Sequence, residues 1–248
     1  MKKKNHILLT ALLSVLFLSP FALIFLRSLD VQAVYQVYLA EPAYLLRFWR
    51  SLALTLVIAL GQTAISILAG YGFAKYDFPG KRALGFALLL MMVLPIQVTL
   101  IPGYMTLRQL NLLNTYYAMA LPMVFVPLGT FLLSRSFRAV PEELIGAARL
   151  DGCGTLGAIF RIAVPAARSG VISVFILSFL DAWNMVEQPI AYVDNTAMYP
   201  LSVYLALSPA AVTTVRFVCV VLASLPPVLL FLSFSQEMNE CIGVGGTK

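Results

Sequence analysis

Polar side chains stand close together inside a long apolar run, Val171–Pro189. An acid near the centre of a bilayer costs about 2.5–3.5 kcal/mol, so it usually faces a cavity or a partner. Carboxylates and amides form hydrogen bonds with polar groups, and aromatic rings provide apolar contact surfaces. We therefore predict that Asp181, Trp183 and Asn184 line a translocation path for a solute, with Gln97 as a further candidate. The alternatives are contact with a partner subunit and, for Trp183, an interfacial anchor.

The chain carries none of the common catalytic signatures. No segment reads G-x-x-x-x-G-K-[S/T], G-x-S-x-G or H-E-x-x-H. One histidine, His6, stands beside three lysines, and the three cysteines are widely spaced. We expect no metal, no cofactor and no enzymatic activity, so any ATP hydrolysis must come from separate subunits.

Composition predicts a protein of the membrane. Of the 248 residues, 60% are hydrophobic and only 11% are charged. Soluble domains are about 45–50% apolar and about 25% charged. The fold class expected is therefore an all-α polytopic membrane protein.

Six apolar stretches are long enough, or nearly so, to cross a bilayer, which takes about 20 residues of helix. These are Ile7–Leu26, Leu52–Tyr71, Ala83–Leu107, Tyr116–Leu133, Val171–Pro189 and Phe217–Phe234. The third contains Pro95 and Pro102, so we expect a kink or a break there. The first could be a signal peptide, but its length and the lack of a small-residue cleavage site favour a retained span.

The distribution of Lys and Arg indicates the orientation. With the N-terminus inside, twelve of the seventeen basic residues fall on the cytoplasmic side. We therefore expect a multi-pass membrane protein with both termini in the cytoplasm.

The segment 134–170, between the fourth and fifth stretches, differs from the other connections. Proline and two acids at Pro141–Glu143 are typical of a helix start, and Gly152 with Gly154 is expected to end that helix. A second helical run, Leu156–Val164, is expected to stop at Pro165. The loop is either a solvated connector or a docking helix whose small residues Gly146, Ala147 and Ala148 allow close approach of another protein.

This loop resembles the E-A-A loop of permeases of binding-protein-dependent ABC importers. The similar residues are Pro141-Glu142-Glu143-Leu144, Ala147-Ala148-Arg149-Leu150-Asp151-Gly152, and Phe160, Ile162 and Val164-Pro165. Similarity continues at Ala69–Lys75 and Leu110–Tyr116. Trp183-Asn184, Pro189, Tyr199-Pro200-Leu201 and the glycine-rich tail 243–248 look like the carbohydrate, maltose-type branch. The glutamate of E-A-A is Gly146 here, and the alanine after D-G is Cys153.

The resemblance implies a type I importer transmembrane domain with a cytoplasmic coupling helix. The residues it assigns to contact with the ATPase are Glu142, Glu143, Leu144, Gly146, Ala147, Ala148, Arg149, Asp151 and Gly152. The expected organisation is a stub, first span and outer loop over 1–47, the transmembrane domain over 48–236 and a tail over 237–248.

By the same resemblance, the expected partners are a second permease, two cytoplasmic ATPase subunits and an extracytoplasmic solute-binding protein. The chain is also expected to contact membrane lipid and a carbohydrate substrate, specifically an oligosaccharide. No nucleic acid partner is expected. The function implied is carbohydrate import by alternating access. The alternatives are a gradient-driven secondary transporter and an importer of a non-sugar solute.

Overall fold

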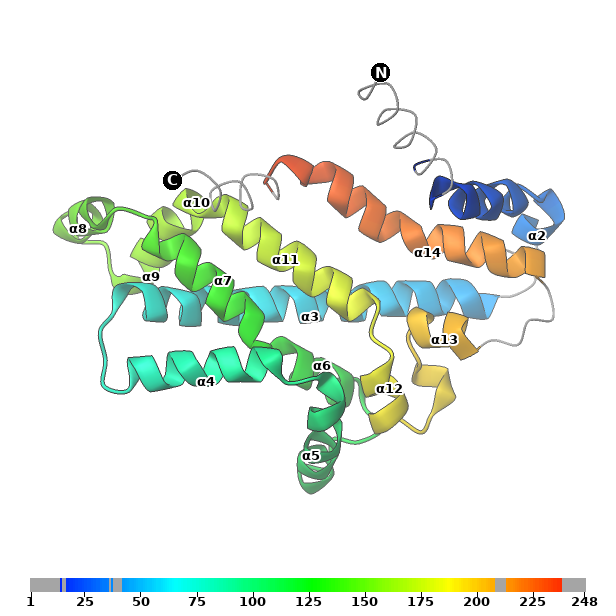
Figure 1. Ribbon diagram of the computed structural model, residues 1–248, viewed down its shortest axis with the longest axis horizontal. Helices are drawn as coiled ribbons and strands as arrows, with labels where there is room; N and C mark the ends of the chain where they lie inside the picture. Colours follow the sequence, from blue (N-terminus) through cyan, green and yellow to red (C-terminus); the bar gives the residue numbers. More distant parts are fainter. Residues whose placement is uncertain (1–13, 15–16, 36, 38–41, 208–212, 238–248) are drawn as a thin grey trace, which may run out of the picture.

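The protein is built from helices that follow one long axis (Figure 1). The computed structural model describes residues 14, 17–35, 37, 42–207 and 213–237, and this part of the chain contains no strand. An unlabelled helix, Phe17–Ser28, comes first. The labelled helices are α2 (Val31–Tyr35), α3 (Pro42–Lys75), α4 (Lys81–Val93), α5 (Ile96–Gln109), α6 (Tyr116–Val124), α7 (Pro127–Arg138), α8 (Glu142–Leu150), α9 (Thr155–Gly157), η2 (Ala158–Ala163), α10 (Val164–Ala166), α11 (Arg168–Trp183), α12 (Glu187–Tyr192), η3 (Thr196–Met198), α13 (Leu201–Leu207) and α14 (Thr213–Ser233).

Helix α3 is the central element, and α7 and α11 pack most extensively against it. It has 34 residues and extends beyond both ends of the predicted span Leu52–Tyr71. A glycine makes close packing possible, because a Cβ on Gly70 would lie 2.8 Å from the Cβ of Leu133 on α7. Small residues let membrane helices approach closely, so Gly70 fixes where α3 and α7 cross.

The predicted third span is broken, as expected, at Pro95. Leu94 adopts an extended conformation with ψ of 125°, which is the conformation that a following proline favours. Helices α4 and α5 consequently meet at a bend of 107°. Pro102 lies inside α5 and interrupts nothing.

The predicted fifth span has different ends in the structure. Helix α11 ends at Trp183, and the chain turns before α12, so the predicted continuous run to Pro189 is wrong. The preceding helical segment continues past Pro165 to Ala166, two residues further than predicted. Ala167, with φ of −108° and ψ of 27°, separates it from α11, and the two meet at a bend of 87°.

Among the described residues, three helices are long and apolar enough to cross a bilayer: Tyr44–Lys75, Tyr116–Arg138 and Val215–Ser233. The two bent pairs would raise that number to five if each pair is one span. The predicted first stretch, Ile7–Leu26, lies partly outside the described residues. The count of six spans therefore stays a prediction, while the helical class and several apolar helices are established.

Candidate functional site

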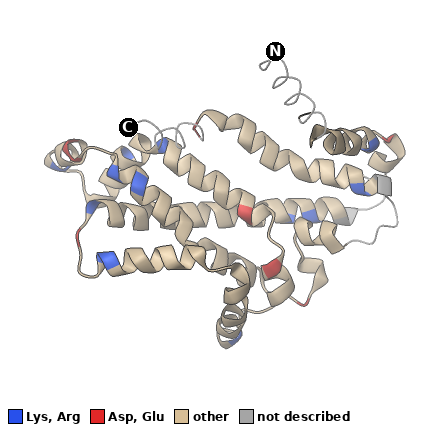
Figure 2. Ribbon diagram, viewed as in Figure 1, with Lys and Arg blue, Asp and Glu red and all other residues tan. Residues whose placement is uncertain are grey.

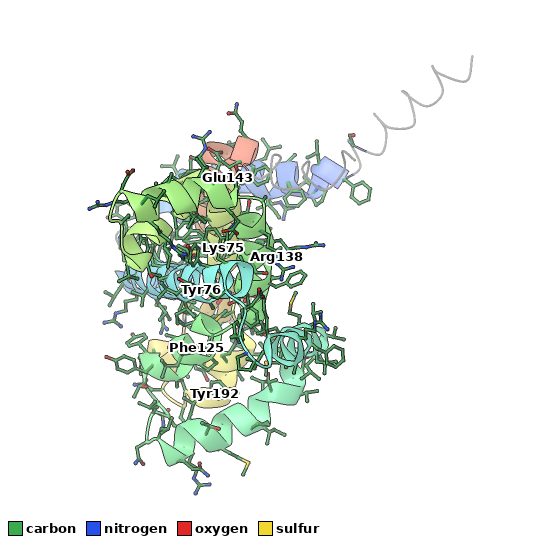
Figure 3. The ribbon with its side chains drawn as sticks, turned by 90° about the vertical axis from the view of Figure 1, so that its left-hand side faces the viewer. Lys75, Tyr76, Phe125, Arg138, Glu143 and Tyr192 are labelled. Atoms are coloured by element: carbon green, nitrogen blue, oxygen red, sulfur yellow. The ribbon has the colours of Figure 1, made fainter. Side chains whose placement is uncertain are left out.

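Helix α8 lies at one end of the molecule, beyond the end of α3 (Figure 1). Seen along the long axis from that end, Lys75, Tyr76 and Arg138 gather beneath α8, which carries Glu143 (Figure 3). The short helix begins where the sequence predicts, directly after Pro141, with two acids in its first turn. Acids there interact favourably with the positive end of the helix dipole.

The two faces of α8 differ in exposure. Ile145 and Ala148 are buried against the rest of the chain. Glu143, Gly146, Ala147 and Leu150 are exposed, and their spacing of three or four residues places them on one side of the helix. Leu150 is 92% exposed, although it is a large apolar residue.

Of the residues predicted to contact an ATPase, Ala148 is buried against the rest of the chain and presents almost no surface. Leu150 is outside the predicted set, but it lies on the same exposed face as Gly146 and Ala147, one turn further along the helix.

A single amine joins α8 to α3. Lys75 Nζ donates hydrogen bonds to the carbonyl oxygen of Val140, at 2.6 Å, and to Glu142 Oε1, at 2.8 Å. The Lys75 side chain is only 3% exposed, whereas that of Glu142 is 72% exposed. The bond to the buried Val140 therefore contributes more to the stability of the folded chain, since exposed ion pairs contribute about 0–1 kcal/mol.

The C-terminal end of α8 is also defined. Gly152 has φ of +81°, a conformation that glycine adopts without steric cost, and it ends the helix as predicted. Arg149 reaches back to donate to Tyr76 Oη at 3.4 Å. In the connection from α3 to α4, the hydrogen bond from Lys81 lowers the pKa of the Asp77 carboxyl.

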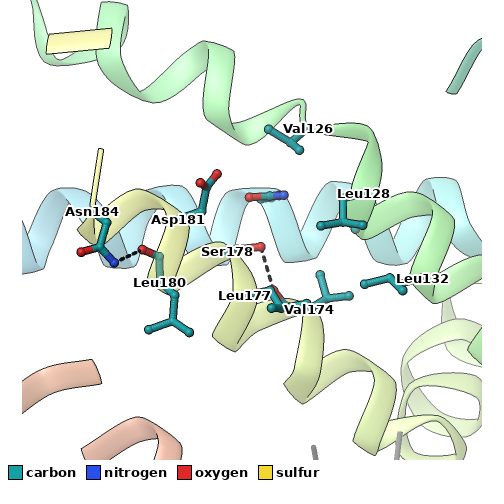
Figure 4. Close-up of a pocket in the computed structure, with 11 residues that line it drawn as sticks. Val126, Leu128, Leu132, Val174, Leu177, Ser178, Leu180, Asp181 and Asn184 are labelled. Atoms are coloured by element: carbon teal, nitrogen blue, oxygen red, sulfur yellow. Dashed lines mark hydrogen bonds between the residues drawn. The ribbon is translucent and has the colours of Figure 1, made fainter. Parts of the chain in front are cut away.

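A second region of interest lies between α3, α7, α11 and α12. Two adjoining cavities of about 460 and 710 Å³ share the lining residues Val126, Leu128, Asp181 and Asn184. We call their union the central cavity. Figure 4 shows the smaller part, with Asp181 and Asn184 from α11 on one side and Val126 and Leu128 on another.

Two of the four residues predicted for a solute path line the central cavity, namely Asp181 and Asn184. Gln97 is exposed in the first turn of α5 and is not among the lining residues. Trp183 is also absent from the lining. Its ring stacks on Phe179 at 5.9 Å, and its Nε1 donates to the carbonyl oxygen of Ala223 on α14 at 3.1 Å.

Trp183 thus lies in the packing between α11 and α14 and not in the lining of the central cavity. The physical reason is helical geometry. Residues advance about 100° each around a helix, so Trp183 lies about 200° from Asp181, whereas Asn184 lies within about 60° of it.

Two glutamines in the central cavity were not predicted for it. Gln62 of α3 and Gln188 of α12 are both buried, and the Oε1 atom of each has no hydrogen-bond partner among the described residues. An unpaired buried polar atom costs about 1–3 kcal/mol. In the sequence these side chains look like ordinary helix–helix hydrogen-bonding residues, and only the fold shows where they lie.

The charged residues have an uneven distribution (Figure 2). Blue segments of Lys and Arg lie toward the ends of α3, α4, α7, α11 and α14, and the middle of the molecule is largely uncharged. The exceptions are the red segments on α11 and α12, which carry Asp181 and Glu187. Both acids line the larger part of the central cavity.

Known proteins share both the sequence and the fold. The family described as "Binding-protein-dependent transport system inner membrane component" matches residues 62–187. The arabinooligosaccharides transport system permease protein AraQ of Bacillus subtilis (strain 168) is 30% identical over 204 residues, which cover 81% of this chain and 73% of that protein. The sulfoquinovosyl glycerol transport system permease protein SmoH of Agrobacterium fabrum is 28% identical, covering 86% and 76%.

A solved structure shows the same fold. A chain of a bacterial ABC transporter involved in the import of the acidic polysaccharide alginate superposes with a TM-score of 0.76 at 20% identity, and the match covers 95% of both chains. The family match spans both the central cavity residues of α3 and α11 and the whole of α8. This chain belongs to the family of binding-protein-dependent transport system inner membrane components.

Proposed function

We propose that this chain is the permease subunit of an ATP-driven importer that moves a carbohydrate, an oligosaccharide, across the bacterial cytoplasmic membrane. Family membership supports transport, and the names of the relatives AraQ and SmoH support a sugar-containing cargo. The positions of Lys and Arg in the sequence support cytoplasmic termini.

The observation that carries the proposal is the exposed face of α8. A large apolar side chain, Leu150, stands fully exposed beside Gly146 and Ala147, whose small size lets another backbone approach. An apolar helix face set among acids is suited to docking in a groove of a partner. We assign this face to one of two cytoplasmic ATPase subunits, which makes α8 the coupling helix.

The mechanism we propose is alternating access. Closure of the ATPase pair displaces α8, and the displacement passes through the Lys75 junction to α3, whose packing partners α7 and α11 line the central cavity. Hydrolysis of ATP returns the helices to the inward-open arrangement. Such a cycle needs a helix bundle with two stable arrangements, and both ATP and a loaded binding protein must favour the outward-open one.

The central cavity is the part of the solute path that this subunit contributes. Asp181 and Asn184 provide polar contacts, and Gln62 and Gln188 add to them. Trp183 holds α11 against α14, so its replacement should impair assembly rather than solute recognition. A second permease would provide the facing half, and an extracytoplasmic binding protein would deliver the solute.

The test is a matched pair of variants in the assembled complex. Leu150→Arg places a charge on the docking face, and Leu110→Arg changes a leucine of similar character, 59% exposed, beyond α5. We expect Leu150→Arg to abolish co-purification of the ATPase subunit and solute-stimulated ATP turnover. Leu110→Arg should retain the ATPase subunit.

The proposal fails if the purified permease brings no ATPase subunit with it, or if uptake of arabinotriose and other neutral oligosaccharides proceeds without ATP. A gradient-driven transporter would give the second result. Equal retention of the ATPase subunit by both arginine variants would contradict the assignment of α8.

A further inference from the structure

The central cavity contains more acceptors than donors. Asp181 and Glu187 contribute carboxylates, which in the ionised form can accept hydrogen bonds but cannot donate them. The Oε1 atoms of Gln62 and Gln188 are two further acceptors without a partner among the described residues, although both oxygens are buried and a solute reaches them only if the amides turn. Each glutamine also carries an amide NH₂, so the cavity can still donate, but its formal charge comes from acids alone.

Several donors that line the cavity are already occupied by the chain itself. Asn184 Nδ2 donates to the carbonyl oxygen of Leu180 at 2.8 Å, and Ser178 Oγ donates to that of Val174 at 2.7 Å (Figure 4). Tyr192 Oη donates to the carbonyl oxygen of Leu100 at 3.2 Å. These bonds leave the acceptors as the groups that most need a partner from outside.

No positive charge balances the two acids within this lining. Among the described residues that line either part of the cavity there is no Lys, Arg or His. Asp181 and Glu187 are both exposed in this chain, so a second negative charge brought beside them would meet like charge with no basic residue of the lining to offset it. Like-charge juxtaposition disfavours such a solute, which is one way that binding sites reject an unwanted partner.

We propose that the central cavity selects uncharged, hydroxyl-rich solutes and rejects solutes that carry a carboxylate, phosphate or sulfonate group. Sugar hydroxyls donate to the exposed carboxylates of Asp181 and Glu187, whereas an anionic group offers only further acceptors. The exposed ring of Phe125, at the larger part of the cavity, provides an apolar surface for a sugar face. This inference rests on the proposed function and narrows its cargo.

The experiment compares two probes of nearly equal size in proteoliposomes that contain the whole complex and a saturating amount of binding protein. The probes are arabinotriose and its aldonate, which differs by one carboxylate. Initial uptake of each is measured for the wild type and for the double variant Asp181→Asn/Glu187→Gln. Because the binding protein and the partner permease are the same in both, a change in the uptake ratio reports on these two side chains.

We expect the ratio of aldonate to arabinotriose uptake to rise about tenfold or more in the double variant. The matched control is Glu237→Gln, an acid beyond the end of α14 and outside the cavity, which should leave the ratio at its wild-type value. If the double variant does not assemble, the single variants Asp181→Asn and Glu187→Gln should each give a smaller rise.

An unchanged ratio in the variants, or a wild type that prefers the aldonate, overturns the inference while leaving carbohydrate import intact. If neither probe enters in the presence of ATP and binding protein, the proposed function itself fails. The two failures are therefore distinguishable.

Discussion

At the scale of single residues, two glycines of α3 have opposite surroundings. A Cβ on Gly70 would lie 2.8 Å from Leu133 Cβ and 3.1 Å from the backbone nitrogen of Ser134. A Cβ on Gly72 would meet nothing within 4 Å. Both glycines are part of the family resemblance, yet only Gly70 is required by packing in this chain.

We predict that Gly70→Ala destabilises the folded protein by about 1–3 kcal/mol, because a backbone atom cannot move aside as a side chain can. Gly72→Ala, two residues along the same helix, should have little effect. Thermal unfolding of both variants in detergent measures the difference. Equal melting temperatures would show that the α3–α7 crossing is less tight than 2.8 Å implies.

The positions of the predicted path residues differ according to the direction in which each side chain leaves its helix. Asp181 and Asn184 are polar groups in an apolar run, and they do line a cavity. Trp183 was grouped with them by proximity in sequence, although helical geometry alone separates it from Asp181. Gln62 was missed because an amide in a span has the same sequence signature whether it faces a neighbouring helix or a cavity.

At the scale of elements, Lys75 connects three helices at one point. Its amine belongs to α3, and its two acceptors, Val140 and Glu142, lie at the end of the α7 segment and the start of α8. Because Val140 is buried, its carbonyl oxygen has no access to water once Lys75 is removed. The exposed carboxylate of Glu142 does not share this limitation.

We predict that Lys75→Met lowers the amount of solute moved per ATP hydrolysed and costs about 1–3 kcal/mol of stability, the penalty of an unpaired buried carbonyl. Glu142→Gln should cost less than about 1 kcal/mol, because the lost ion pair is exposed. Paired assays of uptake and ATP turnover measure the coupling. A Lys75→Met protein that retains the wild-type ratio of uptake to ATP turnover would remove Lys75 from the mechanism.

The ends of the elements show how far sequence rules extend. The start of α8 after Pro141, its end before Gly152 and the break at Pro95 all follow from local backbone preferences and were predicted. The bend at Ala167 was not, because alanine carries no such preference and the neighbouring Pro165 remains inside the helix. The segment before the bend is instead held by tertiary contacts, since Ala158, Ile159 and Ala163 of η2 share a buried cluster with Phe137 of α7 and Val174 of α11.

At the scale of the whole molecule, the helical class and the apolar helices followed from composition and run length. The number of spans did not follow, because two of the apolar runs form pairs of helices bent by 107° and 87°. The length of an apolar run does not show whether it crosses the membrane as one straight helix or as such a bent pair. The orientation still rests on the distribution of Lys and Arg in the sequence.

We predict that Leu150→Cys and Leu110→Cys lie on opposite sides of the membrane, in a background without the native cysteines. A membrane-impermeant maleimide should label Leu110→Cys in intact spheroplasts and Leu150→Cys only after lysis. Both leucines are exposed in the chain by itself, so the permease is expressed without the ATPase subunit, which would cover Leu150. Labelling of Leu150→Cys from the outside would reverse the orientation and place α8 beyond the reach of any cytoplasmic subunit.

The unbroken length of α3 has a mechanical consequence. Thirty-four residues at 1.5 Å each give a rod of about 51 Å, well beyond the roughly 30 Å of hydrocarbon in a bilayer. In its first third, Ser51 accepts a hydrogen bond from the backbone of Leu201, so α3 is held at two well-separated points. If α8 is displaced as we propose, an unbroken rod would carry the movement from Lys75 toward the far surface as one body.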